Sequence, residues 1–323
     1  MQPTDEPAIR LEAVSKRYDD GTTAVHNLSL DVRGGELCVL VGPSGCGKTT
    51  TMKMVNRLVE PTSGRVLLEG EDVMAMDKVA LRRRVGYVIQ QVGLFPHQKV
   101  RDNVATVPSL LGWDRKRTRT RVDELLELVG LPPGTYADRY PAQLSGGQRQ
   151  RVGVARALAA DPLVLLMDEP FSAVDPVARE RLQSEFLRVQ RELGTTVVLV
   201  THDVDEAVRL GDRIAVLRDG GFLEQYADPA TVLGAPASEF VAGFVGSDRT
   251  VKRLSVTPID GASLEPWDGP VSGSLPASAD LGQALALLLE SPDGRVEVRD
   301  GAGRRLGVLT PSALHAAVRP PAA

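Results

Sequence analysis

The segment from Leu37 to Thr49 constrains the fold of this chain more than any other part of the sequence. Its first five residues, Leu37 to Val41, are apolar and have the length of a buried β-strand. They lead into Gly42-Pro43-Ser44-Gly45-Cys46-Gly47-Lys48-Thr49, which matches the pattern G-x-x-x-x-G-K-[ST]. A helix is expected from Lys48 to about Leu58. This order of strand, glycine-rich turn and helix predicts an α/β fold of the P-loop NTPase class.

The glycine-rich loop is expected to hold the phosphates of a nucleotide, ATP. Glycine allows successive backbone N–H groups to turn inward, and the helix N-terminus adds partial positive charge. Lys48 supplies a full charge to the β- and γ-phosphates, and the hydroxyl of Thr49 is a ligand for Mg²⁺. We assign Thr50 to the same site and interpret Cys46 as a small filler inside the loop. A chance glycine-rich turn is disfavoured because eight residues match in this context.

A second motif places two acids directly after an apolar run at residues 164–167. Asp168 stands at the end of the expected strand, where it can hold Mg²⁺ through water. Glu169 follows and is placed to polarise the attacking water as a general base. A strand that merely ends in acids is the alternative, which the nearby phosphate-binding motif disfavours.

The remaining core predicts a parallel sheet with two additions. Continuous apolar runs, typical of strands covered on both faces, are expected to form strands at residues 85–89, 163–167, 196–200 and 213–217. Residues 9–14 and 28–32 alternate more and predict an antiparallel addition. Residues 96–161 lose the strand signal and carry apolar residues at helical spacing, which predicts an inserted helical subdomain.

A third motif, Leu144-Ser145-Gly146-Gly147-Gln148, precedes a basic, alanine-rich stretch that predicts a helix. Ser145 and the amides of the two glycines form another anion-binding helix N-terminus. One nucleotide does not need two such sites on one chain. We therefore expect a homodimer in which the Ser145 motif of each chain covers the ATP bound to the other.

Composition limits the partners. Lys and Arg total 38 against 42 Asp and Glu, a net charge of −4, which disfavours a nucleic-acid partner. The two cysteines, Cys38 and Cys46, lie beside or within the loop, so we expect a reducing cytosol rather than a disulfide framework. Residues 1–10 lack the pattern of a signal peptide, and no run reaches the ~18 apolar residues of a membrane span. If the chain serves a membrane, we expect a peripheral subunit.

The three motifs together resemble the ABC transporter ATPase family, whose defining signature is the sequence Leu-Ser-Gly-Gly-Gln. The resemblance extends from about Ile9 to Val245 and implies an ATPase domain of residues 1–245. It also implies two transmembrane permease subunits as partners, an extracytoplasmic substrate-binding protein acting indirectly, and a location at the cytoplasmic face of the membrane.

The same resemblance assigns roles to four further positions. Tyr18 stands where the family stacks an aromatic ring on adenine; an ordinary surface tyrosine is the alternative. Gln90 stands where a glutamine senses Mg²⁺ and the attacking water, and the neighbouring Gln91 leaves this assignment open by one residue. Asp175 resembles the residue that reports across the dimer. His202 matches the switch histidine that contacts the γ-phosphate.

Four runs resemble the quaternary-amine importer branch, which handles glycine betaine, choline and carnitine: residues 53–58, 81–84, 88–97 and 244–249. The resemblance implies that this chain energises the import of such an osmoprotectant. Importers of amino acids, sugars or phosphate share the core motifs and are the alternative. A non-transport ABC ATPase of DNA repair or translation is disfavoured, because neither a second cassette nor long heptad repeats appear in the sequence.

The composition changes after Gly246 to Ser, Pro, Gly and Asp, which predicts a linker at residues 246–264. Residues 265–323 then predict a small α+β module with a helix, two strands and a closing helix after Thr310. This order resembles a CBS domain, a type that normally occurs in tandem pairs, although only one copy fits here. We hypothesise that two copies, one from each subunit, pair and sense ionic strength or a nucleotide. A dimerisation or packing appendage is the alternative.

Overall fold

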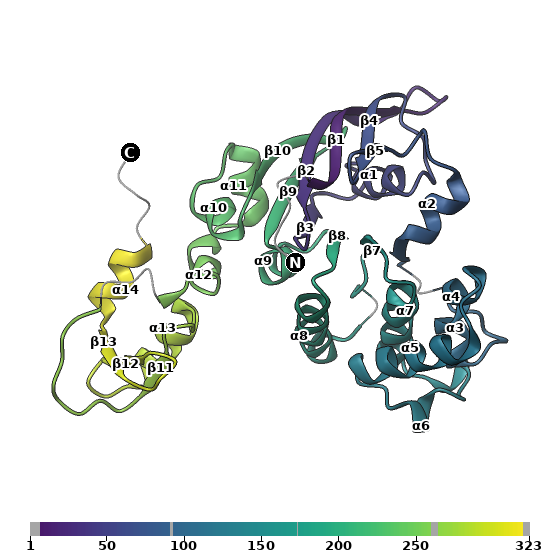
Figure 1. Cartoon of the computed structure of the whole chain (residues 1–323). Helices are drawn as coiled ribbons and strands as arrows, with labels where there is room; N and C mark the ends of the chain where they lie inside the picture. The colour runs from purple at the N-terminus through teal and green to yellow at the C-terminus, as the bar shows by residue number, and fades with distance from the viewer. Residues whose placement is uncertain (1–6, 91–92, 173, 260–263, 319–323) are drawn as a thin grey trace. The chain divides into compact units, whose positions relative to one another are not determined.

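The computed structural model of the chain describes residues 7–90, 93–172, 174–259 and 264–318 (Figure 1). The chain forms two compact units, the first made of Met1–Asp203 and Ala215–Leu223 and the second of Val204–Ile214 and Glu224–Ala323. No helix of the described residues is both long enough and apolar enough to cross a membrane.

A four-stranded antiparallel sheet begins the first unit. Its strand order is β2-β1-β4-β5, with β1 at Pro7–Arg17, β2 at Thr23–Arg33, β4 at Ser63–Leu68 and β5 at Glu71–Asp72. In β1, Leu11 pairs with Leu30 on one side and with Val66 on the other. The antiparallel addition expected from the alternating N-terminal runs is therefore confirmed.

The central sheet has six strands in the order β10-β9-β3-β8-β7-β6. Their bounds are β3 Leu37–Val41, β6 Val85–Val88, β7 Val164–Asp168, β8 Thr196–Thr201, β9 Arg213–Arg218 and β10 Phe222–Ala227. The four strands β3, β8, β7 and β6 pair in parallel, as the continuous apolar runs predicted. Every residue of β3 and β8 is buried, because helices of an α/β fold cover both faces of such strands.

The carboxyl ends of these four parallel strands lie at one edge of the sheet, which places the residues that follow them close together. The phosphate loop follows β3, Glu169 follows β7, His202 follows β8 and Gln90 comes two residues after β6. This edge positions the candidate site.

Helices complete the first unit. They are α1 Lys48–Val55, α2 Lys78–Arg84, α3 Val100–Val104, α4 Thr106–Leu110, α5 Arg115–Leu128, α6 Pro133–Tyr136, the 3₁₀ turn η1 Pro141–Gln143, α7 Gly146–Leu158 and α8 Pro176–Leu193. Between residues 93 and 161 the described chain contains helices and turns and no strand. Helix α1 ends earlier than the expected Leu58, because Arg57 adopts a left-handed conformation with φ 52°.

The second unit contains α9 Val204–Leu210, α10 Pro229–Gly234, α11 Glu239–Val245, α12 Arg249–Leu254, β11 Ser274–Pro276, α13 Leu281–Glu290, β12 Val296–Arg299, β13 Arg305–Leu309 and α14 Pro311–Val318. Strand β12 pairs in parallel with β11 and antiparallel with β13. Thr310 caps α14, since its hydroxyl accepts from the N–H of Ala313 at 3.2 Å.

The stretch 246–264, expected to be a linker, differs from that expectation in its described residues. It contains α12, and both Leu254 and Ile259 belong to the hydrophobic core built by α13 and β12. The Ser- and Gly-rich composition concealed these apolar residues, which lie too far apart in sequence to give a periodic signal. Burial of their side chains makes this part of the stretch structural.

Candidate functional site

The phosphate loop is held in its conformation by close backbone contacts that only glycine permits. A Cβ atom on Gly42 would lie 2.1 Å from the carbonyl oxygen of Leu217, and one on Gly47 would lie 2.0 Å from that of Ala24. Both distances are far below van der Waals contact, so no other residue fits at either position. The phosphate-loop motif contains glycine at both positions. The tertiary structure shows why, because two backbone carbonyl groups leave no room for a side chain.

Lys48 lies buried inside this loop. Its Nζ donates to the carbonyl oxygens of Gly42 and Pro43, at 2.7 Å each, and lies 3.6 Å from Sγ of Cys46. Burial raises the pKa of the Cys46 thiol, and the charge of Lys48 opposes that change. A fully buried, neutral thiol agrees with the interpretation of Cys46 as a filler.

Thr49 connects the phosphate loop to the end of β7. Its hydroxyl donates to Oδ1 of Asp168 at 2.9 Å. Burial raises the pKa of Asp168, and the nearby negative charge of Glu169 acts in the same direction, while the Thr49 bond and Lys53 lower it. A bound cation would favour the carboxylate at this position. Thr49 and Asp168 therefore form a pair of oxygen groups suited to Mg²⁺.

Glu169 brings the other predicted catalytic residues together. Its Oε2 accepts from Nε2 of Gln90 at 3.0 Å, and its Oε1 lies 3.1 Å from Nδ1 of His202. The backbone of Glu169 has φ 44°, an uncommon conformation for this residue type, and its N–H donates to the carbonyl of Val200 at 2.9 Å. In this conformation the carboxylate lies within reach of Gln90, which follows β6, and of His202, which follows β8. Gln91 lies outside the described residues.

Tyr18 lies beside the helix that follows the phosphate loop. Its hydroxyl is 3.5 Å from Oγ1 of Thr50, and the residue is 40% exposed. Nζ of Lys16 stands 5.2 Å from the ring centroid. An exposed aromatic ring close to the triphosphate loop is available to stack on an adenine base.

The Ser145 motif begins helix α7 with a reciprocal cap. The backbone N–H of Gln148 donates to Oγ of Ser145 at 3.2 Å, and that of Ser145 donates to Oε1 of Gln148 at 2.9 Å. The Gln148 amide also donates to the hydroxyl of Tyr136 at 3.3 Å. These bonds remain within the helical subdomain. Gly146 and Gly147 occupy the first turn, where backbone N–H groups lack helical partners.

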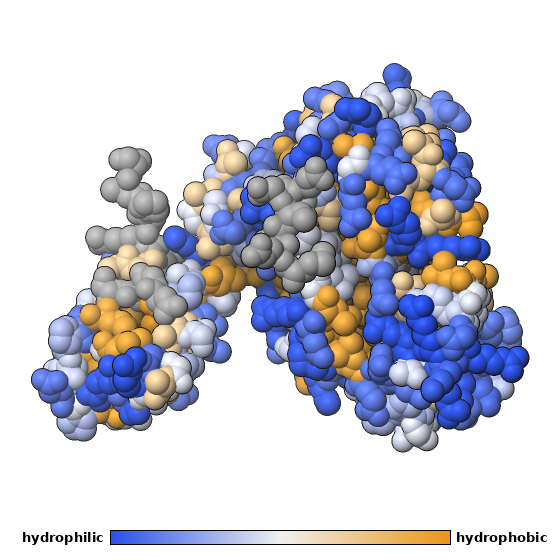
Figure 2. All heavy atoms as spheres, in the orientation of Figure 1, coloured by the Kyte–Doolittle hydropathy of each residue, from blue (hydrophilic) through white to orange (hydrophobic). Residues whose placement is uncertain are grey.

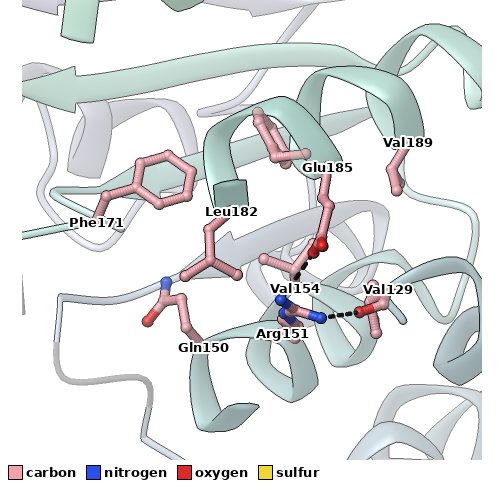
Figure 3. Close-up of a pocket in the computed structure, with 9 residues that line it drawn as sticks. Val129, Gln150, Arg151, Val154, Phe171, Leu182, Glu185 and Val189 are labelled. Carbon is pink, nitrogen blue, oxygen red and sulfur yellow. Dashed lines mark hydrogen bonds and ion pairs between the residues drawn. The ribbon is translucent and has the colours of Figure 1, made fainter. Parts of the chain in front are cut away.

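Asp175 caps the neighbouring helix α8, where its carboxylate accepts from the N–H of Ala178 at 3.0 Å. Figure 3 shows the contacts of Arg151 that join α7 to α8. Arg151 of α7 forms an ion pair with Glu185 of α8 at 3.0 Å and donates to the carbonyl of Val129 at 3.3 Å. The ends that carry Ser145 and Asp175 therefore belong to a connected pair of helices.

The sequence patterns missed residues that support the site. Tyr87 of β6 has its pKa raised to about 12, by burial and by the charge of Asp168. Arg149 donates to the carbonyl of Leu144 at 2.8 Å, which fixes the start of the Ser145 motif. No local pattern identified either residue. Tyr87 lies near Asp168 only because β6 pairs with β7, and Arg149 is one of several basic residues of its helix.

Known proteins share this arrangement. Residues 25–172 match the model of the ABC transporter family. The osmoprotectant import ATP-binding protein OsmV of Salmonella typhimurium is 49% identical over 305 residues, which cover 93% of this chain and 78% of that protein. The chain belongs to the ABC transporter family. The segment matched to the family contains the phosphate loop, the Ser145 motif and Glu169.

Two further relatives agree with this membership. The glycine betaine/carnitine/choline transport ATP-binding protein OpuCA of Bacillus subtilis is 49% identical over 282 residues, or 87% of this chain and 73% of that protein. A solved ATP-binding cassette, described as a dimeric post-hydrolysis state bound to ADP and Pi, superposes with a TM-score of 0.61 at 34% identity over 68% of this chain and 98% of its own. This ABC transporter chain is thus an ATP-hydrolysing subunit.

Proposed function

We propose that this chain energises an importer of quaternary-amine osmoprotectants such as glycine betaine, choline or carnitine. The observation that carries the proposal is the extent of the likeness: relatives named for osmoprotectant import and for betaine, carnitine and choline transport are 49% identical over most of the chain. An importer of an amino acid, a sugar or phosphate would use the same hydrolytic residues and is the second candidate.

In this proposal two copies of the chain bind two transmembrane permease subunits at the cytoplasmic face of the membrane, and an extracytoplasmic binding protein delivers the solute. Residues 1–245 form the ATPase domain, and the helical subdomain at 96–161 contacts the permeases together with the Gln90 segment. The net charge of −4 supports a partner other than nucleic acid.

ATP is proposed to bind between two copies of the chain. The phosphate loop of one copy holds the triphosphate and Tyr18 stacks on the adenine. Ser145, Gly146, Gly147 and Gln148 of the other copy cover the γ-phosphate, and Asp175 reports across the interface. The position of Gly146 and Gly147 in the first turn of α7 supports this role, because the N–H groups of a helix N-terminus attract anions. The dimeric form of a structural relative with ADP and Pi points the same way.

Glu169 is proposed as the general base of hydrolysis. It accepts a proton from water as the water oxygen attacks the γ-phosphorus, and the bond from that phosphorus to the bridging oxygen of ADP breaks. Gln90 and His202 are already within hydrogen-bonding distance of its carboxylate and would orient it and contact the γ-phosphate. Release of phosphate then loosens the dimer.

Thr49, Asp168 and Gln90 are the residues that would hold Mg²⁺. Their donor set is a hydroxyl, a carboxylate and an amide, which are hard oxygen ligands, and water and phosphate oxygens complete such sites. No cluster of three His, Cys, Asp or Glu side chains suited to a metal occurs among the described residues. When bound, Mg²⁺ neutralises charge on the phosphate oxygens.

The C-terminal module from residue 265 is proposed to be CBS-like, to pair with its copy in the other subunit and to sense ionic strength or a nucleotide. Its described part has a β-α-β-β-α order. Within it, the buried carboxylate of Glu297 accepts from Arg305 at 2.7 Å and from Arg299 at 3.0 Å. Arg305 also donates to the carbonyl of Trp267 at 2.9 Å, so this ion cluster connects the Trp267 loop to the sheet.

The cargo is tested by uptake of labelled glycine betaine, choline, an amino acid and a sugar in cells that contain the chain and its permeases. We expect quaternary-amine uptake, lost in Lys48→Ala, and no uptake of the other solutes. Uptake of only a different solute would exclude the osmoprotectant assignment while leaving the ATPase assignment intact. For the module, Arg305→Met should alter the dependence of uptake on external salt; an unchanged dependence would argue for a packing appendage.

A further inference from the structure

The turn between α4 and α5 exposes large apolar side chains to solvent. Leu110 is 59% exposed and Leu111 is 40% exposed. Gly112 follows with φ 73°, and the N–H of Trp113 donates to the carbonyl of Pro108 at 3.1 Å, so a tight turn presents these residues. Exposed leucines beside a tryptophan are typical of a surface that enters an apolar phase.

The first two turns of α5 carry an unusual concentration of positive charge. Residues 113–121 contain five basic side chains, Arg115, Lys116, Arg117, Arg119 and Arg121, against the single acid Asp114, although the chain as a whole has a net charge of −4. Basic residues in a first helical turn oppose the helix dipole. Arg115, Lys116 and Arg117 in this first turn therefore do not stabilise the helix through its dipole. Figure 2 shows mainly hydrophilic residues over α5.

The nearby carboxylates are already engaged. Asp114 accepts from the N–H of Arg117 at 2.9 Å as the helix cap. Asp161 and Glu124 both pair with Arg121, the latter at 3.7 Å. Within the described parts of the chain, Arg115 and Lys116 have no carboxylate within ion-pair distance.

Arg117 and Trp113 line an open recess. The guanidinium of Arg117 stands 3.5 Å from the centroid of the Trp113 ring, which leaves its charge unneutralised. The recess has a volume of about 460 Å³, and its charged lining also includes Lys116 and Arg121 together with the engaged carboxylates of Asp114, Glu124 and Asp161. Because those carboxylates are engaged, Arg115 and Lys116 remain available to an anionic group, and they follow the exposed leucines closely in sequence.

We propose that this tip, residues 110–117, docks on the anionic headgroups of a phospholipid bilayer. Arg115, Lys116 and Arg117 contact the phosphates, while Leu110, Leu111 and Trp113 enter the interface between headgroups and acyl chains. A nucleic acid would take the cations but offers no apolar phase for the leucines. The proposal does not depend on which solute the transporter carries.

The test is co-sedimentation of the full chain with vesicles of phosphatidylcholine containing phosphatidylglycerol, compared with phosphatidylcholine alone. We expect binding only to the anionic vesicles, reversed by salt because the charges are screened. Each basic residue removed should weaken binding by roughly fivefold. Arg115→Ser combined with Lys116→Ser, and separately Leu110→Ser combined with Leu111→Ser, should therefore reduce binding, whereas ATP hydrolysis in solution stays at the native rate.

The matched control removes the same two charges elsewhere, Arg181→Ser with Arg191→Ser on α8, and should leave vesicle binding unchanged. In a Trp267→Phe background, fluorescence from the remaining tip tryptophan should shift to the blue with anionic vesicles. Absence of binding, equal binding to neutral vesicles, or an equal loss in the control would each overturn the proposal. Binding without the fluorescence shift would also overturn it, because the charges alone would then account for the contact.

Discussion

The Glu169 end of the sheet and the Ser145 end of α7 differ in how their polar groups are satisfied. At the sheet edge, side chains from separate strands contact one another: Gln90 and His202 both reach Glu169. At the helix end, Ser145 and Gln148 cap each other within four residues of sequence. The first region is assembled by the fold of one chain, whereas the second is capped by residues of a single helical turn, with Gly146 and Gly147 in that turn. The proposed site, shared between two chains, would combine these two regions.

The largest expected effect lies at the sheet edge. Glu169→Gln should lower ATP hydrolysis by about 10²- to 10⁴-fold, because the amide cannot accept the proton of water. ATP binding should persist, and a dimer should accumulate with ATP. Phosphate release and light scattering after gel filtration measure the two results. Glu290→Gln, the same change at the exposed end of α13, is the control. Hydrolysis at the native rate in Glu169→Gln would remove Glu169 from the role of base.

At the helix end, Ser145→Ala should lower hydrolysis by roughly tenfold to a hundredfold, as expected for loss of a hydrogen bond to a charged group. The lost cap should also cost about 1 kcal/mol of stability. Ser145→Asn separates the two contributions, because asparagine caps a helix as well as serine does. It should restore the melting temperature but not hydrolysis. Recovery of both would reduce Ser145 to a structural cap.

Mixing the two variants examines the shared site directly. A heterodimer of Glu169→Gln and Ser145→Ala chains contains one site in which both halves are native. Mixing should therefore restore part of the hydrolysis that each variant lacks alone. No restoration is expected if the Ser145 motif serves the nucleotide of its own chain.

A smaller effect is expected at Tyr18, which lies at the periphery of the sheet-edge region. Tyr18→Ala should weaken ATP binding by at least about fivefold, the lower range of base stacking on an aromatic ring. Tyr18→Phe keeps the ring and removes only the hydroxyl near Thr50, so it should bind ATP like the native chain. Titration with a fluorescent ATP analogue measures both. Equal affinities for the alanine and phenylalanine variants would favour an ordinary surface tyrosine.

The smallest expected effect concerns the stability of the ligand-free chain. Because burial raises the pKa of Asp168, folding disfavours its charged form, and this penalty grows as the pH rises through the range between the ordinary and the raised value. Asp168→Asn removes the charge and should melt at a slightly higher temperature at neutral pH. The difference should shrink as the pH falls toward the ordinary pKa of aspartate. A lower melting temperature at neutral pH would contradict the burial penalty.

The local motifs of the ATPase core were predictable because their chemistry is encoded in short runs. Gly42 to Thr49 specifies its own turn through glycine, and the apolar runs of β3 and β7 have the composition of buried strands. The contacts among Gln90, Glu169 and His202 were assigned through family resemblance, since 79 and 33 residues separate Glu169 from the other two. The roles of Leu254 and Ile259 in the C-terminal core escaped prediction, because isolated apolar residues give no periodic signal.

The sequence alone determined the phosphate loop, the two acids after β7 and the Ser145 cap, because each depends on neighbours within a few residues. Only the tertiary structure decided which strands lie side by side, and hence that the Glu169 carboxylate meets Gln90 and His202 at one edge. It also decided that the carbonyls of Ala24 and Leu217 close over the loop glycines. Strand order and close packing depend on contacts between distant segments, which a local pattern does not contain.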